Sequence, residues 1–165
     1  MTEPHDSHRG TEPAEDLGWA LGSLLRGYRE RIGPLLEDVP HGPRGYQTLC
    51  EVIRGEQPSQ LALATHLGID RTVMTYLIDG LVEAGLVERR QNPADRRQRQ
   101  VVATARGRRL VARTCGRVAA AEEEVLGGLE PGERDVLRRL LAKAALVDGR
   151  TSHDPDACAV VTEDG

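Results

Sequence analysis

The stretch from residue 60 to residue 85 constrains the fold most, because its small and apolar residues have the spacing of two closely crossing helices. Ala64 leaves room where the helices cross, and Gly68 supplies the turn four residues later. Met74 and Leu77 place apolar side chains on the second helix, facing the first. The pattern predicts a helix-turn-helix with Asp70 capping the second helix, residues 71–84, although an ordinary αα-hairpin has a similar pattern.

A change of period follows this segment and predicts two strands. Residues 86–90 and 98–104 have strand-like patterns, and residues 91–95 form the turn that joins them. A two-stranded hairpin directly after a helix-turn-helix is typical of a wing. Residues 89–113 also hold nine arginines and one acid, a net charge of +8 in a chain whose total charge is −4. Such a concentrated basic patch favours binding to nucleic-acid phosphates.

The candidate DNA-binding residues lie on the second helix and on the wing. The exposed helix face would enter the major groove, and wing arginines suit a narrow minor groove. Asp95 could orient a neighbouring guanidinium through a charge-assisted pair. The full set is Arg71, Thr72, Thr75, Tyr76, Asp95, Arg96, Arg97 and Arg99.

Helical periodicity covers most of the remaining chain. Asp16 is expected to cap a first helix, Thr104 to cap a long helix whose apolar residues continue to Leu129, and Pro131 to begin the last helix. The expected fold is mainly α with a small β-wing: a winged helix-turn-helix at about 45–104, flanked by dimerisation helices at 17–33 and 104–147. The long helix needs an apolar partner, which a second copy of the chain would supply.

The two ends of the chain differ from this region in composition. Residues 1–16 and 148–165 are polar and acidic and are expected to be disordered tails. No run of 18 apolar residues and no signal-like start is present, so we expect a cytoplasmic protein.

Three segments resemble the multiple-antibiotic-resistance-regulator (MarR) family of winged-helix transcription factors. They are LALATHLGIDRTVMTYLIDGLVEAGLVERR (61–90), NPADRRQRQVVAT (92–104) and Gly107, within a resemblance that spans roughly 17–147. The resemblance implies a homodimer with interlocking terminal helices, which represses a palindromic operator until a small, often aromatic or anionic, ligand releases it. It also implies that Thr72, Thr75 and Tyr76 contact bases or phosphates, and that Arg97 enters the minor groove with Asp95 as its anchor.

The same resemblance locates a ligand pocket and marks where this chain departs from the family. The pocket would lie between the helical platform and the winged helix, in reach of Trp19, Tyr28, Arg29, His41 and Tyr46. Ala103-Thr104 replaces the usual Leu-Thr, and Glu130-Pro131 replaces the usual Ser-Pro. Many members carry a basic side chain at the place of Tyr76, so the base preference stays open.

Other functions have less support in the residues. No catalytic motif is present, and neither a cofactor nor a metal site is expected, because Cys50, Cys115 and Cys158 form no C-x-x-C pair and residues 104–129 contain no histidine. Two alternatives stay open: a regulator that senses oxidation through a cysteine, and a winged helix that serves as a protein-interaction module.

Overall fold

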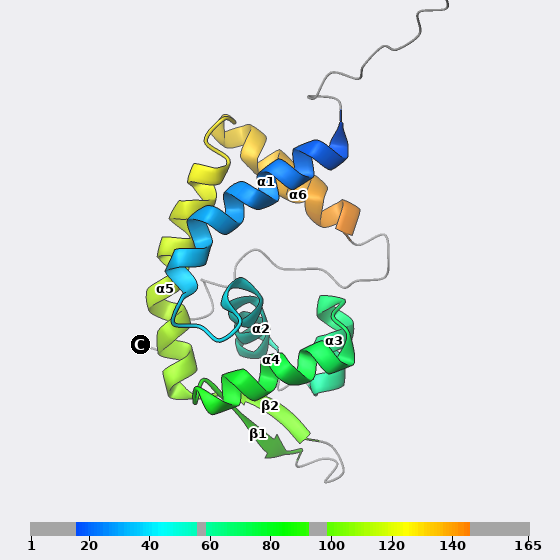
Figure 1. Ribbon diagram of the computed structural model, residues 1–165, viewed down its shortest axis with the longest axis vertical. Helices are drawn as coiled ribbons and strands as arrows, with labels where there is room; N and C mark the ends of the chain where they lie inside the picture. The colour runs from blue at the N-terminus through cyan, green and yellow to red at the C-terminus, as the bar shows by residue number, and fades with distance from the viewer. Residues whose placement is uncertain (1–15, 56–58, 93–98, 146–165) are drawn as a thin grey trace, which may run out of the picture.

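The computed structural model describes residues 16–55, 59–92 and 99–145. The helix α5 runs along one side of the molecule, with α1 and α6 at one end and the two strands at the other (Figure 1). The elements in chain order are α1 (Leu17–Ile32), the 3-10 helix η2 (Gly33–Leu36), α2 (Gly42–Arg54), α3 (Gln60–Leu67), α4 (Arg71–Glu83), β1 (Val87–Gln91), β2 (Arg99–Ala103), α5 (Ala105–Val125) and α6 (Pro131–Ala145).

The predicted helix-turn-helix is confirmed in α3 and α4. Ala64 is buried where the two helices meet, and Gly68 ends α3 with a left-handed φ of 60°. Asp70 caps α4, its carboxylate accepting hydrogen bonds from the backbone N–H groups of Thr72 (2.8 Å) and Val73 (3.3 Å). These hydrogen bonds lower the pKa of Asp70, so its negative charge is held at the helix N-terminus, where the helix dipole favours it.

The wing is the antiparallel pair β1 and β2. Its register places Val87 opposite Ala103 and Gln91 opposite Arg99. Residues 93–98 lie outside the described residues, and with them the tip of the hairpin. An isolated bridge from Ser59 to Gln100 joins the start of α3 to β2, so the wing is tied to the helix-turn-helix.

The junction between the wing and α5 is closely packed. The Thr104 hydroxyl accepts a hydrogen bond from the Gly107 N–H (3.1 Å) and donates one to the Gly85 carbonyl (2.7 Å). Gly107 approaches the backbone so closely that a Cβ there would lie 2.1 Å from the Leu86 carbonyl oxygen. The predicted cap is therefore confirmed, and it also fixes the direction in which α5 leaves the wing.

Several predicted boundaries differ from those observed. The long helix ends at Val125, so the expectation that it reaches Leu129 is wrong; Gly127 and Gly128 follow its end, and glycine is a poor helix former. The last helix begins at Pro131 as predicted. Glu133 accepts a hydrogen bond from the Glu130 N–H (2.9 Å), which compensates for the missing serine cap.

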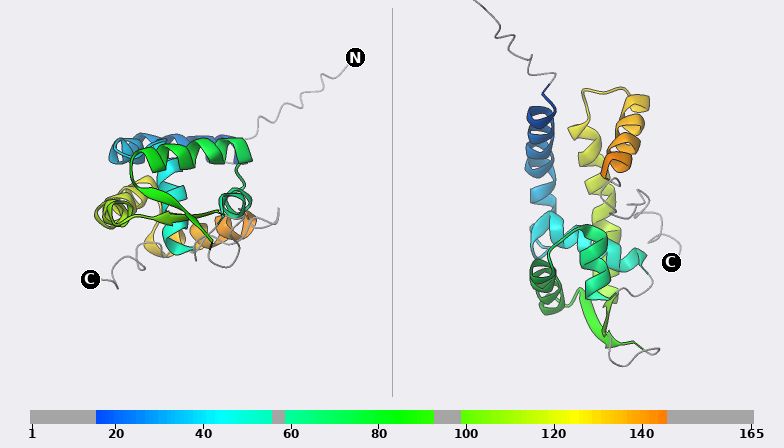
Figure 2. Two further views of the ribbon diagram at one scale, coloured as in Figure 1. Left: turned by 90° about the horizontal axis from the view of Figure 1, so that it is seen from below. Right: turned by 90° about the vertical axis from the view of Figure 1, so that its right-hand side faces the viewer.

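The buried core is concentrated in the winged-helix part. Core residues come from η2, α2, α3, α4, both strands and α5. In contrast, Ile32 is the only buried residue of α1, and none of residues 131–144 in α6 is buried. Both helices lie at the end of the molecule farthest from the strands (Figure 2, right). They expose the large apolar side chains Leu17, Trp19, Leu21, Leu25, Val136, Leu140 and Leu141. Among the described residues, the helices lack the combination of length and hydropathy that crossing a bilayer requires.

Candidate nucleic-acid interface and pocket

The outer face of α4 is polar and exposed. Arg71, Thr72, Thr75 and Tyr76 all lie on this face, and the Tyr76 side chain is 65% exposed. The opposite face packs into the core through Met74, Leu77, Ile78 and Leu81. Seen from below, α4 and the strands lie in front of the rest of the molecule (Figure 2, left), so the helix and the wing share one surface.

A polar network fixes α4 relative to α3 and β1. The Thr75 hydroxyl accepts a hydrogen bond from the Gln60 amide (2.6 Å) and donates one to the Arg71 carbonyl (2.9 Å). The guanidinium of Arg89 donates to the Gln60 amide oxygen (3.4 Å) and to the Asp79 carboxylate (2.5 Å). The hydroxyl of Thr75 is thus engaged within the protein both as acceptor and as donor.

Ion pairs reduce the charge that two arginines contribute to the basic patch of residues 89–113. Arg89 pairs with Asp79, and Arg90 pairs with Glu88, so these two side chains are partly neutralised by their neighbours. Both arginines were counted within the basic patch from the sequence, because their acidic partners lie just outside the counted segment. Arg99 is exposed at the first position of β2.

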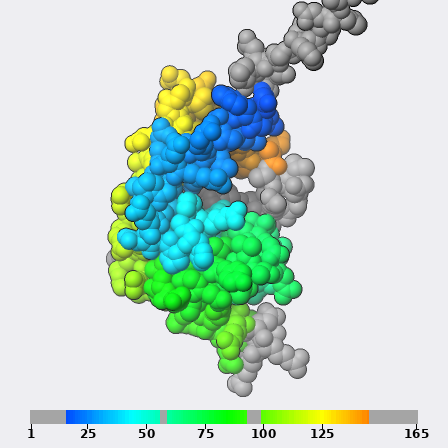
Figure 3. Space-filling view, viewed as in Figure 1, coloured from blue at the N-terminus to red at the C-terminus, as the bar shows by residue number. Residues whose placement is uncertain are grey.

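Other charged residues predicted from the sequence lie on α5 or at the wing tip. Four arginines of the basic patch are exposed on α5: Arg106, Arg108, Arg109 and Arg113. The predicted wing-tip residues Asp95, Arg96 and Arg97 lie outside the described residues. Figure 3 shows the strand end of the molecule opposite the end formed by α1.

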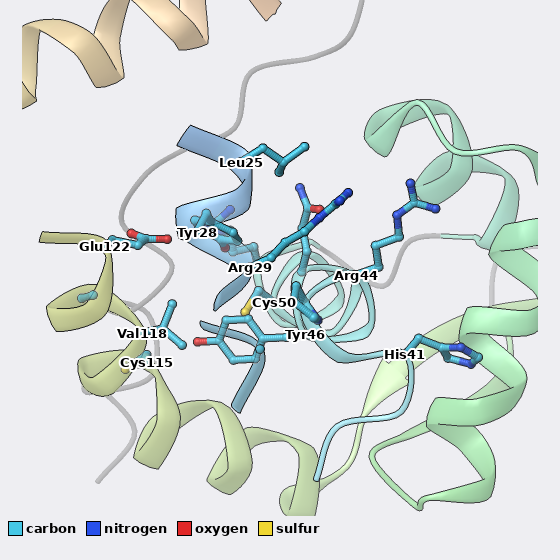
Figure 4. Close-up of a pocket in the computed structure, with 15 residues that line it drawn as sticks. Leu25, Tyr28, Arg29, His41, Arg44, Tyr46, Cys50, Cys115, Val118 and Glu122 are labelled. Carbon is cyan, nitrogen blue, oxygen red and sulfur yellow. The ribbon is translucent and has the colours of Figure 1, made fainter. Parts of the chain in front are cut away.

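A cavity of about 740 Å³ lies between α1, α2 and α5. Its wall contains three arginines, Arg29, Arg44 and Arg54, and one acid, Glu122, which comes from the α5 side (Figure 4). The other lining residues are Leu25, Tyr28, Gly33, His41, Pro43, Tyr46, Gln47, Cys50, Cys115, Val118 and Ala119. Cationic, aromatic and apolar groups therefore line one space of the size that a small organic molecule requires.

Four of the five residues predicted for a ligand pocket line this cavity: Tyr28, Arg29, His41 and Tyr46. Trp19 does not; its side chain is 56% exposed on α1. Several α2 residues of the wall were not predicted from the sequence: Pro43, Arg44, Gln47, Cys50 and Arg54. Positions 43, 47, 50 and 54 have three- and four-residue spacing, which places them on one face of a helix and could have identified them.

Burial alters the titration of two groups in the cavity. It raises the pKa of Cys50 to about 11, although the Tyr46 hydrogen bond and the Arg54 charge act in the opposite direction. Burial likewise raises the pKa of Tyr28, and the charge of Glu122 adds to the effect. Both side chains are therefore neutral near pH 7, and the cavity's positive charge comes from its arginines.

A chain of polar contacts connects the cavity with the helix-turn-helix. Arg54 donates to the buried Glu51 carboxylate (2.6 Å), whose second oxygen lies 3.0 Å from Nε2 of His66 on α3. Within the ranges that the structure describes, no group of three or more His, Cys, Asp or Glu side chains is arranged to hold a metal ion.

Comparisons with known proteins agree with this architecture. The sequence model of the MarR family matches residues 46–98. The transcriptional repressor CouR, solved bound to a 23-mer DNA duplex, is 31% identical; the alignment covers 81% of this chain and 95% of CouR, with a TM-score of 0.73. A MarR-family regulator from Rhodococcus sp. RHA1 is 27% identical, with coverage of 81% and 96% and a TM-score of 0.72.

A third structure is similar in fold. It is BpsR of Bordetella bronchiseptica, described as regulated in its DNA binding by 6-hydroxynicotinic acid. Its identity to this chain is 24%, the alignment covers 82% of this chain and 96% of BpsR, and the TM-score is 0.73.

Proposed function

The chain belongs to the MarR family and is a DNA-binding transcriptional regulator, and from this premise we propose that it is a homodimeric repressor of a palindromic operator, released by a small ligand. The observation that carries the proposal is the shared surface of α4 and the wing. This surface carries the exposed residues Arg71, Thr72 and Tyr76 on α4 and the exposed Arg99 on β2. Because a single helix fits the major groove, α4 would contact base edges while the arginines contact phosphates. A regulator that acts on chromosomal DNA would work in the cytoplasm.

For the wing tip we propose the roles that the family resemblance implies. Arg97 would enter the minor groove, Asp95 would orient it, and Arg96 would contact the backbone. On α4, Thr75 would contribute its methyl group to a base contact, because Gln60 and the Arg71 carbonyl engage its hydroxyl.

The exposed apolar side chains of α1 and α6 support the homodimer. Leu17, Leu21, Val136 and Leu140 line two helices that contribute little to the chain's own core. A matching patch on a second copy would bury them and hold two winged helices at a fixed separation. That separation would have to match the roughly 34 Å between successive major grooves on one face of DNA.

The cavity between α1, α2 and α5 supports a small anionic or aromatic effector. Arg29 and Arg44 would bind a carboxylate, and Tyr28 and Tyr46 would pack against a ring. Arg54 is already paired with Glu51. BpsR is described as regulated by an aromatic acid, and PcaV of Streptomyces coelicolor was solved with its natural ligand. A ligand here would change the angle between the helical platform and the winged helix, and so the spacing of the two recognition helices.

Fluorescence anisotropy with duplexes tiled from the upstream region of the protein's own gene tests this function. We expect tight binding to one palindromic tile, weakened steeply when salt is raised. Arg97→Ala should weaken this binding about a hundredfold, on the order of 1–3 kcal/mol for a specific contact, without unfolding the protein. Arg31→Ala, on the exposed end of α1, is the matched control and should bind normally.

Other outcomes would favour the alternatives. Uniform weak binding to every tile, unchanged by Arg97→Ala, would contradict the operator proposal and favour a protein-interaction module. A cysteine-based redox switch is less well supported, because the raised pKa of Cys50 keeps its thiol protonated and thiolates are the reactive form.

A further inference from the structure

We propose that the imidazole of His41 is a positioning strut that sets where the recognition helix α4 lies relative to the cavity wall. The inference rests on the proposed function, because it assigns His41 the role of linking the cavity to the DNA-reading helix. Its evidence is a set of three features that meet at one place: a left-handed backbone at His41, a side-chain hydrogen bond to α4, and a glycine opposite the ring.

The backbone of His41 has an unusual conformation. Its φ of 64° is the only positive φ of a non-glycine residue in the part of the chain that the structure describes, and Gly42 follows with a φ of 56°. Left-handed backbone is unfavourable for most side chains, so a reason for histidine here is needed. His41 is at the cavity rim, and Figure 4 shows its imidazole turned toward α4 and away from the other labelled side chains.

The imidazole contacts the backbone of α4 directly. Nε2 of His41 lies 3.1 Å from the carbonyl oxygen of Tyr76. A carbonyl oxygen only accepts, so Nε2 carries the proton and donates it. The Tyr76 side chain belongs to the exposed face of α4, yet its carbonyl is bound by a residue 35 positions earlier in the chain.

Gly80 makes room for this contact. A Cβ at Gly80 would lie 2.6 Å from Nε2 of His41, 3.1 Å from Cδ2 and 3.3 Å from Cβ of Pro40. Glycine is among the poorest helix formers, yet here it occupies the interior of α4. Gly80 is also the residue whose N–H the Tyr76 carbonyl accepts in a regular α-helix, so ring, carbonyl and glycine share one turn.

The segment that carries His41 is itself fixed to the cavity wall. Val39 is buried, and Gly45 of α2 packs on Pro40 so closely that a Cβ there would lie 1.8 Å from the Pro40 carbonyl oxygen. Arg44, in the same turn of α2 as Gly45, lines the cavity. The side chain of His41 therefore adds a polar contact between this wall and the middle of the recognition helix, beside the apolar packing of α2 on α4.

Amide hydrogen exchange of α4 in Gly80→Ala tests the strut. Helix propensity alone predicts that alanine slows exchange about fourfold. The strut predicts the opposite, because the new methyl group displaces the imidazole and removes a hydrogen bond; exchange should become roughly threefold to tenfold faster. Gly116→Ala in α5 is the matched control, because a Cβ added there would meet no atom within 4 Å. In this variant the amide exchange of α5 should only become slower.

The second variant, His41→Asn, separates the ring from the backbone. Asparagine tolerates left-handed backbone but is too short to reach the Tyr76 carbonyl. In this background Gly80→Ala should reverse its effect and slow exchange, since no imidazole remains to be displaced. In the wild-type protein the Tyr76 carbonyl should protect the Nε2–H proton of His41 from exchange with water, and this protection should be lost in Gly80→Ala.

The proposal is overturned if Gly80→Ala slows exchange equally in both backgrounds, or if the Nε2–H proton of His41 is equally protected from exchange with and without the added methyl group. These measurements need neither DNA nor effector. Failure of the strut is therefore distinguishable from failure of the proposed regulatory function, which the anisotropy experiment tests.

Discussion

The two ends of this molecule differ in how far their apolar side chains are buried within the chain. The winged-helix end buries its apolar side chains within the chain, and its turns are closed by caps and close backbone contacts such as that of Gly107. The end formed by α1 and α6 leaves its apolar side chains exposed, with Ile32 the one buried residue of α1. The first end therefore buries its core within one chain, and in the homodimer that we propose a second copy would cover the exposed apolar side chains of the other end.

The largest effect is expected on stability, at the closely packed junction between the wing and α5. Gly107→Ala places a Cβ 2.1 Å from the Leu86 carbonyl oxygen, so the backbone must shift. We expect a loss of about 3–5 kcal/mol in the free energy of unfolding, measured by urea denaturation. Gly116→Ala, whose added methyl group meets open space, is the control, and an equal loss in both variants would contradict the close-contact account.

The second-largest effect is expected on dimerisation through the end formed by α1 and α6. Leu140→Glu replaces an apolar side chain that is 55% exposed on α6. It should leave the monomer fold intact and raise the dimer dissociation constant at least tenfold. The reason is that the interface loses the free energy of burying a leucine side chain, about 1.5–3 kcal/mol. Sedimentation velocity over a concentration series measures it.

A matched control exists at the other end of the molecule. Leu61 of α3 is 52% exposed, and Leu61→Glu makes the same chemical change there. It should not change the association state. Equal dissociation constants for wild type and Leu140→Glu would show that α6 is not the dimer surface.

A smaller effect concerns the cavity between the two ends. With a pKa of about 11, Cys50 is almost entirely protonated at pH 8, and its alkylation by iodoacetamide should be on the order of a hundredfold slower than that of an ordinary thiol with a pKa near 8.5. Tyr46→Phe removes the hydrogen bond that lowers this pKa, so alkylation should slow further. Peptide mapping by mass spectrometry follows Cys50 separately; faster alkylation in Tyr46→Phe would contradict the assigned bond.

The smallest effect is expected at the exposed ion pairs between α5 and α6. Nη1 of Arg134 lies 2.6 Å from Oε2 of Glu123, and Arg138 pairs with the same carboxylate. The two guanidinium groups hold the pKa of Glu123 below its usual value. A lowered carboxyl pKa stabilises the folded form above the unfolded-state pKa, and this contribution is lost as the pH falls through the lowered one. The melting temperature should therefore fall less between pH 7 and pH 3 in Glu123→Gln than in the wild type. A parallel decline in the two proteins would exclude the pair.

Local rules allowed much of the fold to be predicted from the sequence. Asp70, Thr104 and Gly68 act within a few residues of their own positions, so their roles as caps and turn are visible in the sequence. The end of α5 was missed because the apolar spacing continues through Leu129, while Gly127 and Gly128 interrupt the backbone regardless of that spacing.

Contacts between distant segments could not be predicted in the same way. The pairing of Arg89 with Asp79 and the bond from His41 to Tyr76 depend on how separate elements cross. Arg54 is different, because its three- and four-residue spacing from Pro43, Gln47 and Cys50 already places it on their face of α2. The cavity residues Tyr28, Arg29, His41 and Tyr46 were predicted from the pocket position that the family resemblance implies.

In the proposed homodimer, the end formed by α1 and α6 joins two copies, and the winged-helix end of each copy reads one half of an operator. A stoichiometric anisotropy titration of the palindromic duplex, beside a duplex with one half-site scrambled, tests this arrangement directly. The account predicts two chains per palindrome, with affinity at least about a hundredfold lower on the scrambled duplex, since the specific contacts of one recognition helix are lost. One chain per duplex with equal affinity for both would contradict it.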